Sequence, residues 1–361
     1  MKVQACRDGL PETQHAIEAI ALDAGGAVLF QTLQAQTLHT FLRSAGKLFQ
    51  LHAVLSSCAP QSSIPDEALA VAMASHTGSP AHVQWVNWWL NQARVSAQAL
   101  CCGAHPPLDA ETRRALGQQA RSPSALHNNC SGKHAAMVYA CVQNGWPLTP
   151  PENYLAASHP LQQRVLAELS GRLALKKQSL RTAIDGCGVP TFWLTLPQIA
   201  KLYASAAREV AAQNFKNIAP ATHAAQTEPA QPELTAACLP SDWLPRLWGA
   251  ATLHPELAGG KTRIDSVLMA VGQGRLLAKV GAEGLIAVAY HHQSTQAGLT
   301  LKVLDGDETA RTHAVLAVLQ HLQWLTEAQV QAVFAGLDSA QALPTRTNWA
   351  GTPVGQWQIE F

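Results

Sequence analysis

Strand-like segments stand near both ends of this chain, and helical patterns fill the middle. Residues 17–32 read as two apolar runs around Asp-Ala-Gly-Gly at 23–26, a turn that tolerates the positive φ angles of a hairpin. Residues 276–291 and 299–304 are typical of strands, with a link near residues 296–298, and the C-terminal VGQWQIEF resembles a last strand. This order does not match a regular βαβ array. We therefore predict an α+β fold in which helices pack on an antiparallel sheet.

Apolar side chains recur at helical spacing through the central part of the chain. The clearest pattern ends in Asn144-Gly145, a good C-cap. The trio Trp85, Trp88 and Trp89 is interpreted as core or subunit-interface packing. Between residues 214 and 240 the periodicity fails, so we predict a flexible insertion there. The predicted helices cover residues 37–49, 65–75, 81–100, 131–145, 161–173, 196–213, 309–325 and 327–337.

The balance of charges excludes several classes of function. With 25 basic and 24 acidic residues the net charge is +1, so no overall field favours nucleic acid or an anionic membrane. No apolar run reaches the roughly 18 residues of a membrane-spanning helix, and the first residues, MKVQACRDGLPETQ, lack the apolar core of a secretion signal. We expect a soluble, cytoplasmic protein whose eight cysteines are mostly free thiols. Its 361 residues are expected to form one catalytic unit over 1–361, with room for two lobes.

Ser44 and Lys47 stand three residues apart, a spacing that puts both on one face of a helix. If that face is buried, desolvation lowers the pKa of the lysine, and its neutral amine can take the proton of the serine. Penicillin-binding proteins and serine β-lactamases use this S-x-x-K arrangement. Alone it is a weak signal, because an exposed lysine near a helix start gives the same letters.

The string HNNCSGKH at residues 127–134 is dense in functional groups at the start of an apolar helix. Cys130 and Lys133 are one turn apart in it, and Cys187 lies in a second, glycine-flanked loop, IDGCGVP. Two thiolates and a neutral amine can hold a zinc ion with one position left open. The spacing matches no zinc motif, so a capped helix start and a small buried residue in a turn remain the competing interpretations.

Six segments in the order RSAGK, ASHTG, CGAHPP, HNNCSGKHAAM, DGCGVPTF and AKVGAEG run from Arg43 to Gly284. Together they resemble the signature segments of the thermolabile, Rhizobium-type (class 3) L-asparaginase family, also described as L-asparaginase II. The resemblance covers nearly the whole chain. It implies a fold similar to that of serine β-lactamases and penicillin-binding proteins, an asparagine substrate and a homodimer.

The resemblance also implies roles for individual residues. Ser44 with Lys47 and Ser75 with Lys279 form two Ser-Lys pairs in one pocket. Zinc is held by Cys130, Lys133 and Cys187, and Asp185 lies beside these ligands. Arg43, His134 and Asn129 are predicted to bind the substrate, because an arginine fork suits a carboxylate. Ser44 attacks the amide carbon, Lys47 acts as base, and Ser75 with Lys279 relays the proton.

Three positions depart from the family's pattern. Leu48 stands where a proline is expected, Ser79 replaces a glutamate, and residues 264–266 lack the cysteine of some relatives. Three other functions stay open. A penicillin-reactive acyl-serine enzyme would share S-x-x-K, but Lys279 is followed by Val280-Gly281 and not by the rest of a K-T-G motif. A zinc-activated-water amidohydrolase and a non-enzymatic zinc protein are the other two.

Overall fold

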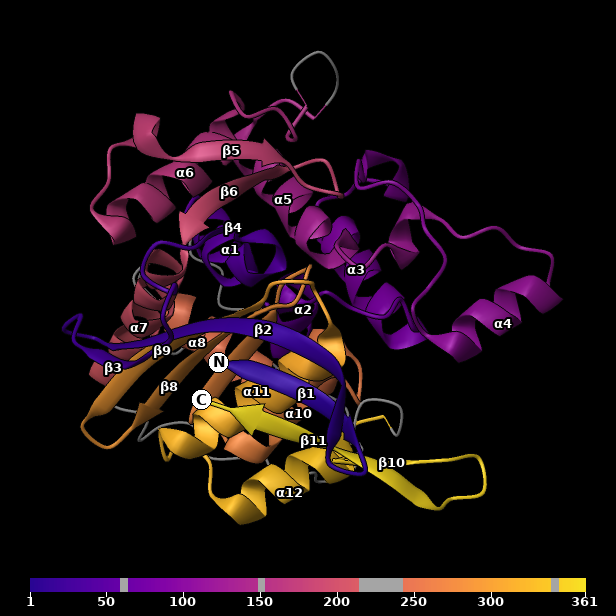
Figure 1. Cartoon of the computed structure of the whole chain (residues 1–361). Coiled ribbons are helices and arrows are strands. Elements are labelled where there is room, and N and C mark those ends of the chain that lie inside the picture. Colours follow the sequence, from indigo (N-terminus) through magenta and orange to yellow (C-terminus); the bar gives the residue numbers. More distant parts are fainter. Residues whose placement is uncertain (59–63, 149–152, 214–242, 339–343) are drawn as a thin grey trace.

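An eight-stranded antiparallel sheet is the largest layer of the computed structural model, which describes residues 1–58, 64–148, 153–213, 243–338 and 344–361. The strands follow the order β10-β11-β1-β2-β9-β8-β7, with β3 paired to β2 (Figure 1). The long β2 joins the two halves, since it pairs with β1 at one end and with β9 and β3 at the other. The strands are β1 (Lys2–Arg7), β2 (Leu10–Asp23), β3 (Val28–Gln31), β7 (Leu276–Val280), β8 (Leu285–His292), β9 (Thr295–Val303), β10 (Thr345–Thr347) and β11 (Pro353–Glu360).

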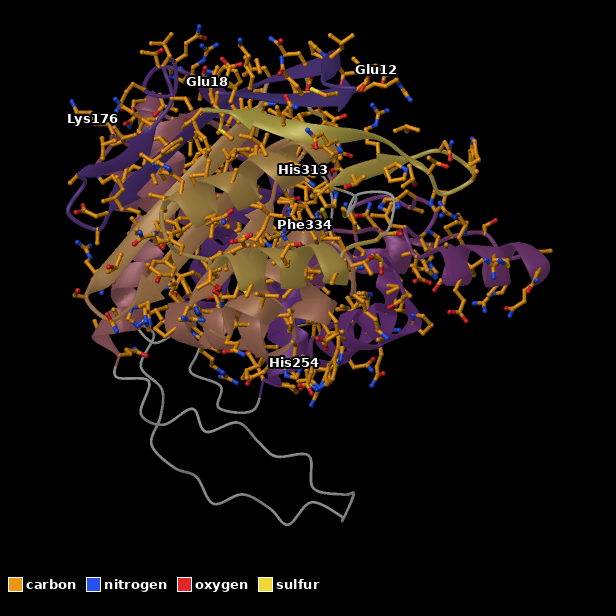
Figure 2. The ribbon with its side chains drawn as sticks, turned by 60° about the horizontal axis from the view of Figure 1, so that its bottom comes forward. Glu12, Glu18, Lys176, His254, His313 and Phe334 are labelled. Carbon is orange, nitrogen blue, oxygen red and sulfur yellow. The ribbon has the colours of Figure 1, made fainter. Side chains whose placement is uncertain are left out.

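Both faces of this sheet are covered near β2. Ile20 and Leu22 cluster with Leu196 and Ala200 of helix α7 (Leu196–Ala212), whereas the alternate residues of the strand belong to the main core. This explains why β8 and most of β9 are buried continuously and not on alternate residues. Helices α11 (Glu308–His321) and α12 (Glu327–Gly336) pack against each other, with the rings of His313 and Phe334 5.3 Å apart (Figure 2).

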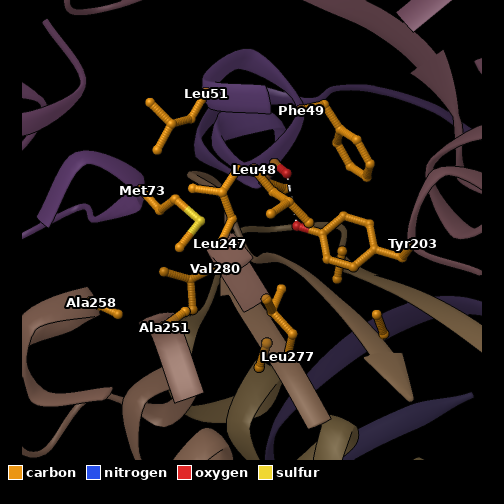
Figure 3. Packing of buried hydrophobic residues seen from close by; sticks show 14 of the residues in the cluster. Leu48, Phe49, Leu51, Met73, Tyr203, Leu247, Ala251, Ala258, Leu277 and Val280 are labelled. Atoms are coloured by element: carbon orange, nitrogen blue, oxygen red, sulfur yellow. Dashed lines mark hydrogen bonds between the residues drawn. The ribbon is translucent and has the colours of Figure 1, made fainter. Parts of the chain in front are cut away.

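Helices α1, α2, α3 and α6 pack around α5 (Ser131–Asn144), which is buried over its first eleven residues, whereas α8, α9 and α10 lie between α2 and the large sheet. Figure 3 shows Leu48 of α1 beside Met73 of α2 and Leu247 of α8. Tyr203 of α7 donates a hydrogen bond to the carbonyl of Ala45 at 2.7 Å, which fixes the start of α1 against the sheet layer. These helices are α1 (Lys47–Leu55), α2 (Asp66–Met73), α3 (Pro80–Gln92), α4 (Ala110–Gln118), α6 (Pro160–Leu173), α8 (Trp243–Leu253), α9 (Pro255–Gly259) and α10 (Ile264–Gly272).

A second sheet of three strands lies beside this helical region, in the order β4-β6-β5. Its strands are β4 (His39–Phe41), β5 (Arg181–Ile184) and β6 (Pro190–Thr195). The loop between β5 and β6 carries Cys187, and the residues after β4 enter the short 3-10 turn η1 (Arg43–Gly46). This small sheet therefore brings residues 43–47 and 185–187 together.

The predicted α+β class is confirmed: the large sheet is antiparallel and helices pack on it. The hairpin at residues 17–32 is also confirmed, with Asp23 N donating to Ala27 O at its turn. The helices predicted at 131–145, 161–173 and 196–213 appear with ends within one or two residues. Trp89 packs in the core and donates to the carbonyl of Ala68, as the core interpretation requires.

Four predicted boundaries are wrong. Residues 39–41 form β4 because they pair with β6, so the first helix begins only at Lys47. The third helix ends at Gln92, where Arg94 turns into the left-handed region at φ 54°. Residues 296–298 lie inside β9, and the link is at Gln293, whose φ is 52°. Residues 276–291 are two strands, not one.

Other elements have no counterpart in the sequence predictions, among them β1, α4, α8 and α10. The insertion predicted at residues 214–240 lies outside the described residues. Across the described ranges, every helix is too short or too polar to span a bilayer.

Candidate active site

Four chain segments meet where α1, the end of α2, the start of α5 and β7 come together. Helix α5 contacts α2 closely at Gly132, where a Cβ would lie 2.2 Å from the carbonyl oxygen of Val71 in α2. Only glycine lets α5 contact the backbone of α2 in this way. The residues just after α2 consequently lie beside the loop that opens α5, and His76 N donates to Asn129 O at 3.1 Å.

Ser75 lies between two buried lysines. Lys47 Nζ and Lys279 Nζ each donate to Ser75 Oγ at 3.1 Å. Lys47 also donates to the carbonyls of Ala74 and Asn129. Ser75 is 5% exposed, Lys47 1% and Lys279 5%, so all three polar groups sit in a low-dielectric environment. The predicted pairing of Ser75 with Lys279 thus corresponds to a hydrogen bond, and Lys47 joins the same serine.

Burial lowers the pKa of both amines. For Lys47, desolvation is the largest influence, and Lys133 lowers its pKa further against the opposing effect of Cys130. For Lys279, desolvation outweighs the stabilising charge of Asp265, and the pKa falls well below the usual lysine value. A neutral amine has a lone pair that can accept the proton of a serine hydroxyl. The cluster is therefore equipped for general-base chemistry.

Ser44 lies in η1, one turn before Lys47, and is half-buried. Its neighbour Arg43 has a φ of 46°, a conformation that costs free energy in a residue other than glycine. This backbone is held from two sides: Arg43 N donates to Thr191 Oγ at 3.0 Å, and Arg43 Nε donates to Asp185 at 2.5 Å. In the described structure the hydrogen bonds of the Lys47 amine go to residues 74, 75 and 129, not to Ser44.

Cys130, Lys133 and Cys187 come together at the start of α5. Lys133 Nζ donates to Cys187 Sγ at 3.3 Å, and the two thiols are in hydrogen-bond contact. The hydrogen bond from Cys187 lowers the pKa of Cys130 well below its usual value, and the nearby Lys47 and Lys133 add to this effect. The second proton of the thiol pair is held more tightly, so the pKa of Cys187 is raised. Burial alone would lower the pKa of Lys133, but the sulfur charges outweigh it and the pKa is raised.

The spacing of these donors can be compared with what a metal requires. A zinc ion bound by sulfur and nitrogen at about 2.0–2.3 Å with tetrahedral angles holds neighbouring donors about 3.5 Å apart. The 3.3 Å between Lys133 Nζ and Cys187 Sγ is near this spacing, so the donor set fits, provided that the metal displaces the proton of Lys133. No group of three or more His, Cys, Asp or Glu side chains suited to a metal occurs in the described ranges. The predicted set contains only two such residues, because its third donor is a lysine.

The predicted substrate-binding residues occupy different environments. Arg43 is partly exposed, with 31% of its side chain accessible, and pairs with Asp185 through one nitrogen of its fork. Asn129 is half-buried and its backbone is held by His76, Lys47 and His105. His134 is fully buried against Tyr154 Oη at 2.9 Å, and burial keeps it neutral by lowering its pKa. A contact between His134 and substrate stays a prediction.

Two groups of residues near the cluster were given no role by the sequence analysis. Arg263 and the fully buried Asp265 form an ion pair that contacts Lys279 and Ser75. His76 accepts a hydrogen bond from Gly78 N and shares one with Ser131 Oγ at 3.0 Å. The sequence signals were an Arg-x-Asp pair at the start of an apolar helix and a histidine inside ASHTG.

Comparison with known proteins adds one finding. The model of a protein family described as L-asparaginase II matches residues 3–359, nearly the whole chain. A search of curated proteins finds no match.

Proposed function

This chain belongs to the L-asparaginase II family, and from this premise we propose that it hydrolyses the side-chain amide of L-asparagine by Ser-Lys catalysis beside a zinc site. Membership makes the protein a hydrolase that acts on the amide of asparagine. The products are L-aspartate and ammonia. The observation that carries the mechanism is that the hydroxyl of Ser75 connects the buried amines of Lys47 and Lys279, each at 3.1 Å, which supports one hydrogen-bonded relay through both lysines.

In the proposed reaction Ser44 Oγ attacks the amide carbon and passes its proton to the neutral amine of Lys47. Ser44 is favoured as the nucleophile because it is more accessible than Ser75. The tetrahedral intermediate collapses when ammonia leaves with a proton, and an ester on Ser44 remains. Ser75 and Lys279 relay that proton, which their hydrogen bonds allow. Water then hydrolyses the ester, releases aspartate and restores the hydroxyl of Ser44.

Arg43 is proposed to bind the α-carboxylate of the substrate with the nitrogens that its contact to Asp185 leaves available. Asn129, which stands beside Lys47, is proposed to orient the amide. Cys130, Lys133 and Cys187 would hold the zinc ion. Asp185 would lie beside these ligands and orient Arg43 through their hydrogen bond. When bound, zinc supplies Lewis acidity that polarises a carbonyl or a water.

The strings HNNCSGKHA and DGCG also support a closer assignment, to the thermolabile, Rhizobium-type (class 3) branch. With it comes a proposed likeness to the serine β-lactamase fold and a homodimeric assembly. The S-x-x-K segment at the start of a helix beside an antiparallel sheet is consistent with that fold. We also propose that the chain forms a single catalytic unit and is located in the cytoplasm.

Ammonia release from asparagine by the wild type, Ser44→Ala and Ser75→Ala tests the assignment of the serines. We expect both variants to lose kcat by about 10³-fold or more, because Ser44→Ala removes the nucleophile and Ser75→Ala interrupts the proton relay between Lys47 and Lys279. Ser170→Ala is the matched control: Ser170 is as buried as Ser75, and its hydroxyl donates to the carbonyl of Ala167 within α6. Activity near the wild-type level in Ser44→Ala would remove Ser44 as the nucleophile. Labelling of either serine by a fluorescent penicillin would favour the acyl-serine alternative.

Metal analysis of the purified protein tests the zinc site. We expect about one zinc ion per chain in the wild type and a large loss of zinc in Cys187→Ser, because two donors hold zinc far more weakly than three. Cys141→Ala is the control, since Cys141 is a fully buried thiol of α5, the helix that also carries Lys133. Equal zinc in Cys187→Ser would contradict the site. If chelation abolished activity while Ser44→Ala kept it, a zinc-activated water would be the better mechanism.

A further inference from the structure

An ion pair with a buried carboxylate, Arg263–Asp265, lies next to the Ser75–Lys279 contact. Arg263 donates to both oxygens of Asp265, through Nε at 2.6 Å and Nη2 at 2.9 Å. The same carboxylate lies 3.5 Å from Lys279 Nζ. Asp265 is 0% exposed, so its carboxylate is shielded from water, whereas 21% of the Arg263 side chain is exposed. The pair thus connects α10, which begins one residue after Arg263, to β7.

Each partner also holds a piece of backbone in the cluster. Arg263 Nη1 donates to the carbonyl of Ser75, and Nη2 donates to the carbonyl of Ala258 at 3.0 Å. The amide of Val280 donates to Asp265 Oδ2 at 3.2 Å, which ties the carboxylate to the residue after Lys279. Gly259 leaves room for the guanidinium, because a Cβ there would lie 2.3 Å from Arg263 Nη2. Both reacting positions, 75 and 279, are therefore fixed by this one pair.

The charges of Arg263 and Asp265 act on Lys279 in opposite directions, so its amine can stay neutral and act as a base. Arg263 engages the carboxylate bidentately, which is the strongest geometry for such a pair. The distance between Asp265 Oδ2 and Lys279 Nζ is 3.5 Å, longer than the hydrogen bonds from Arg263. The carboxylate therefore orients the amine without forming a tight ion pair with it. Arg263 also opposes a positive charge on Lys279, and the pKa of Lys279 stays well below the usual value.

We propose that Asp265, held by Arg263, is a positioning residue that sets Lys279 Nζ on Ser75 Oγ, an inference that rests on the Ser-Lys mechanism proposed above. Arg263 has a second part in the same function, since it fixes the backbone of Ser75. Neither side chain contacts the reacting atoms of a substrate. Loss of the pair should consequently reduce turnover while leaving substrate binding nearly intact.

Three variants compared with the wild type test this inference: Asp265→Asn, the double variant Arg263→Gln with Asp265→Asn, and Glu18→Gln. For Asp265→Asn we expect kcat to fall about a hundredfold, at the lower end of what a positioned base contributes, with KM within about twofold. The double variant removes the buried carboxylate charge together with the partly exposed guanidinium that pairs with it, so it should recover thermal stability but not kcat. Glu18 is a buried carboxylate that accepts hydrogen bonds from Thr32 Oγ1 and Gln34 N, away from the Ser-Lys cluster, and Glu18→Gln should leave kcat unchanged.

Crystal structures of the wild type and the variants give a second readout that does not depend on activity. We expect Lys279 Nζ to leave hydrogen-bond distance of Ser75 Oγ in the Asp265→Asn protein and in the double variant. If Asp265→Asn does not fold, the kcat of the double variant and the position of its Lys279 Nζ test the inference instead. The inference is overturned if kcat stays within about twofold of the wild type and Nζ keeps its position. A wild type that releases no ammonia from asparagine would defeat the proposed function, and the crystal structures alone would then decide the positioning role.

Discussion

At the scale of single residues, the cluster depends on lysine amines whose charged form is destabilised by burial. Lys279 is 5% exposed, and the desolvation of its charged form is the largest influence on its pKa. Such a group costs folding free energy at any pH where the unfolded chain would hold the proton and the folded chain does not. The same property makes the amine useful as a base at neutral pH.

Replacing this amine by an apolar side chain should stabilise the protein. Because the folded pKa of Lys279 lies below its usual value of 10.5, the unfolded chain binds more protons between those two values, and stability falls as the pH falls through that window. Lys279→Met removes this cost, by about 1–4 kcal/mol if it follows other buried charges replaced by apolar residues. Asp265 keeps Arg263 as its partner in this variant. Denaturant unfolding between pH 7 and 10.5 measures the effect.

The gain in stability should be largest toward neutral pH and should shrink as the pH approaches 10.5. Lys176, which lies at the surface in Figure 2, provides the control. Lys176→Met should change stability little and without pH dependence. A Lys279→Met protein less stable than the wild type at neutral pH would show that the amine is charged and well paired.

At the scale of elements, local signals predicted most of the helices but few of their contacts. Helix α5 ends at Gly145 with a φ of 64°, as the Asn-Gly signal predicts. The first helix was placed too early, because the pairing of β4 with β6 outweighs the local pattern of residues 39–41. What makes the site is a contact between elements, the approach of α5 to α2 at Gly132.

Gly132→Ala should separate these two helices. The added Cβ meets the carbonyl oxygen and carbon of Val71 at 2.2 and 2.8 Å, and backbone atoms cannot move aside as a flexible side chain can. We expect a loss of about 1–3 kcal/mol in unfolding free energy, as for other overpacked positions. Since Ser75 follows α2 directly, kcat should also fall. Thermal denaturation and ammonia release measure the two effects.

Gly117→Ala is the matched control, because it lies within α4 and a Cβ there meets nothing within 4 Å. Alanine should stabilise that helix by about 0.5–1 kcal/mol. If Gly132→Ala behaved like Gly117→Ala, close packing of α5 on α2 would not be required for the site.

At the scale of the whole molecule, the site draws its residues from distant parts of the chain. Lys47, Ser75, Asn129 and Lys279 lie in four segments, and β7 contributes its lysine from the large sheet. The half-buried Trp85 and Trp88 on α3 show that part of the aromatic trio remains at the surface. These rings are suited to a subunit contact, which agrees with the proposed homodimer.

We expect light scattering after size-exclusion chromatography to give twice the chain mass of 38.5 kDa at micromolar concentration. Changing both Trp85 and Trp88 to alanine should lower that mass toward a single chain if α3 forms the contact, because buried aromatic residues supply much of an interface's binding free energy. A single-chain mass for the wild type would contradict the homodimer.

The sequence by itself determined the α+β class, the main hairpin and several helix boundaries, because hydrophobic periodicity and turn residues are local properties, and its distinctive strings predicted the candidate site residues. It paired Ser44 with Lys47 by their spacing along one helix. Only the tertiary structure decided that the amine of Lys47 reaches Ser75, and that Arg263 and Asp265 stand behind Lys279. Burial, and with it the lowered pKa of both amines, depends on packing between segments far apart in the chain. No local pattern of residues encodes that desolvation.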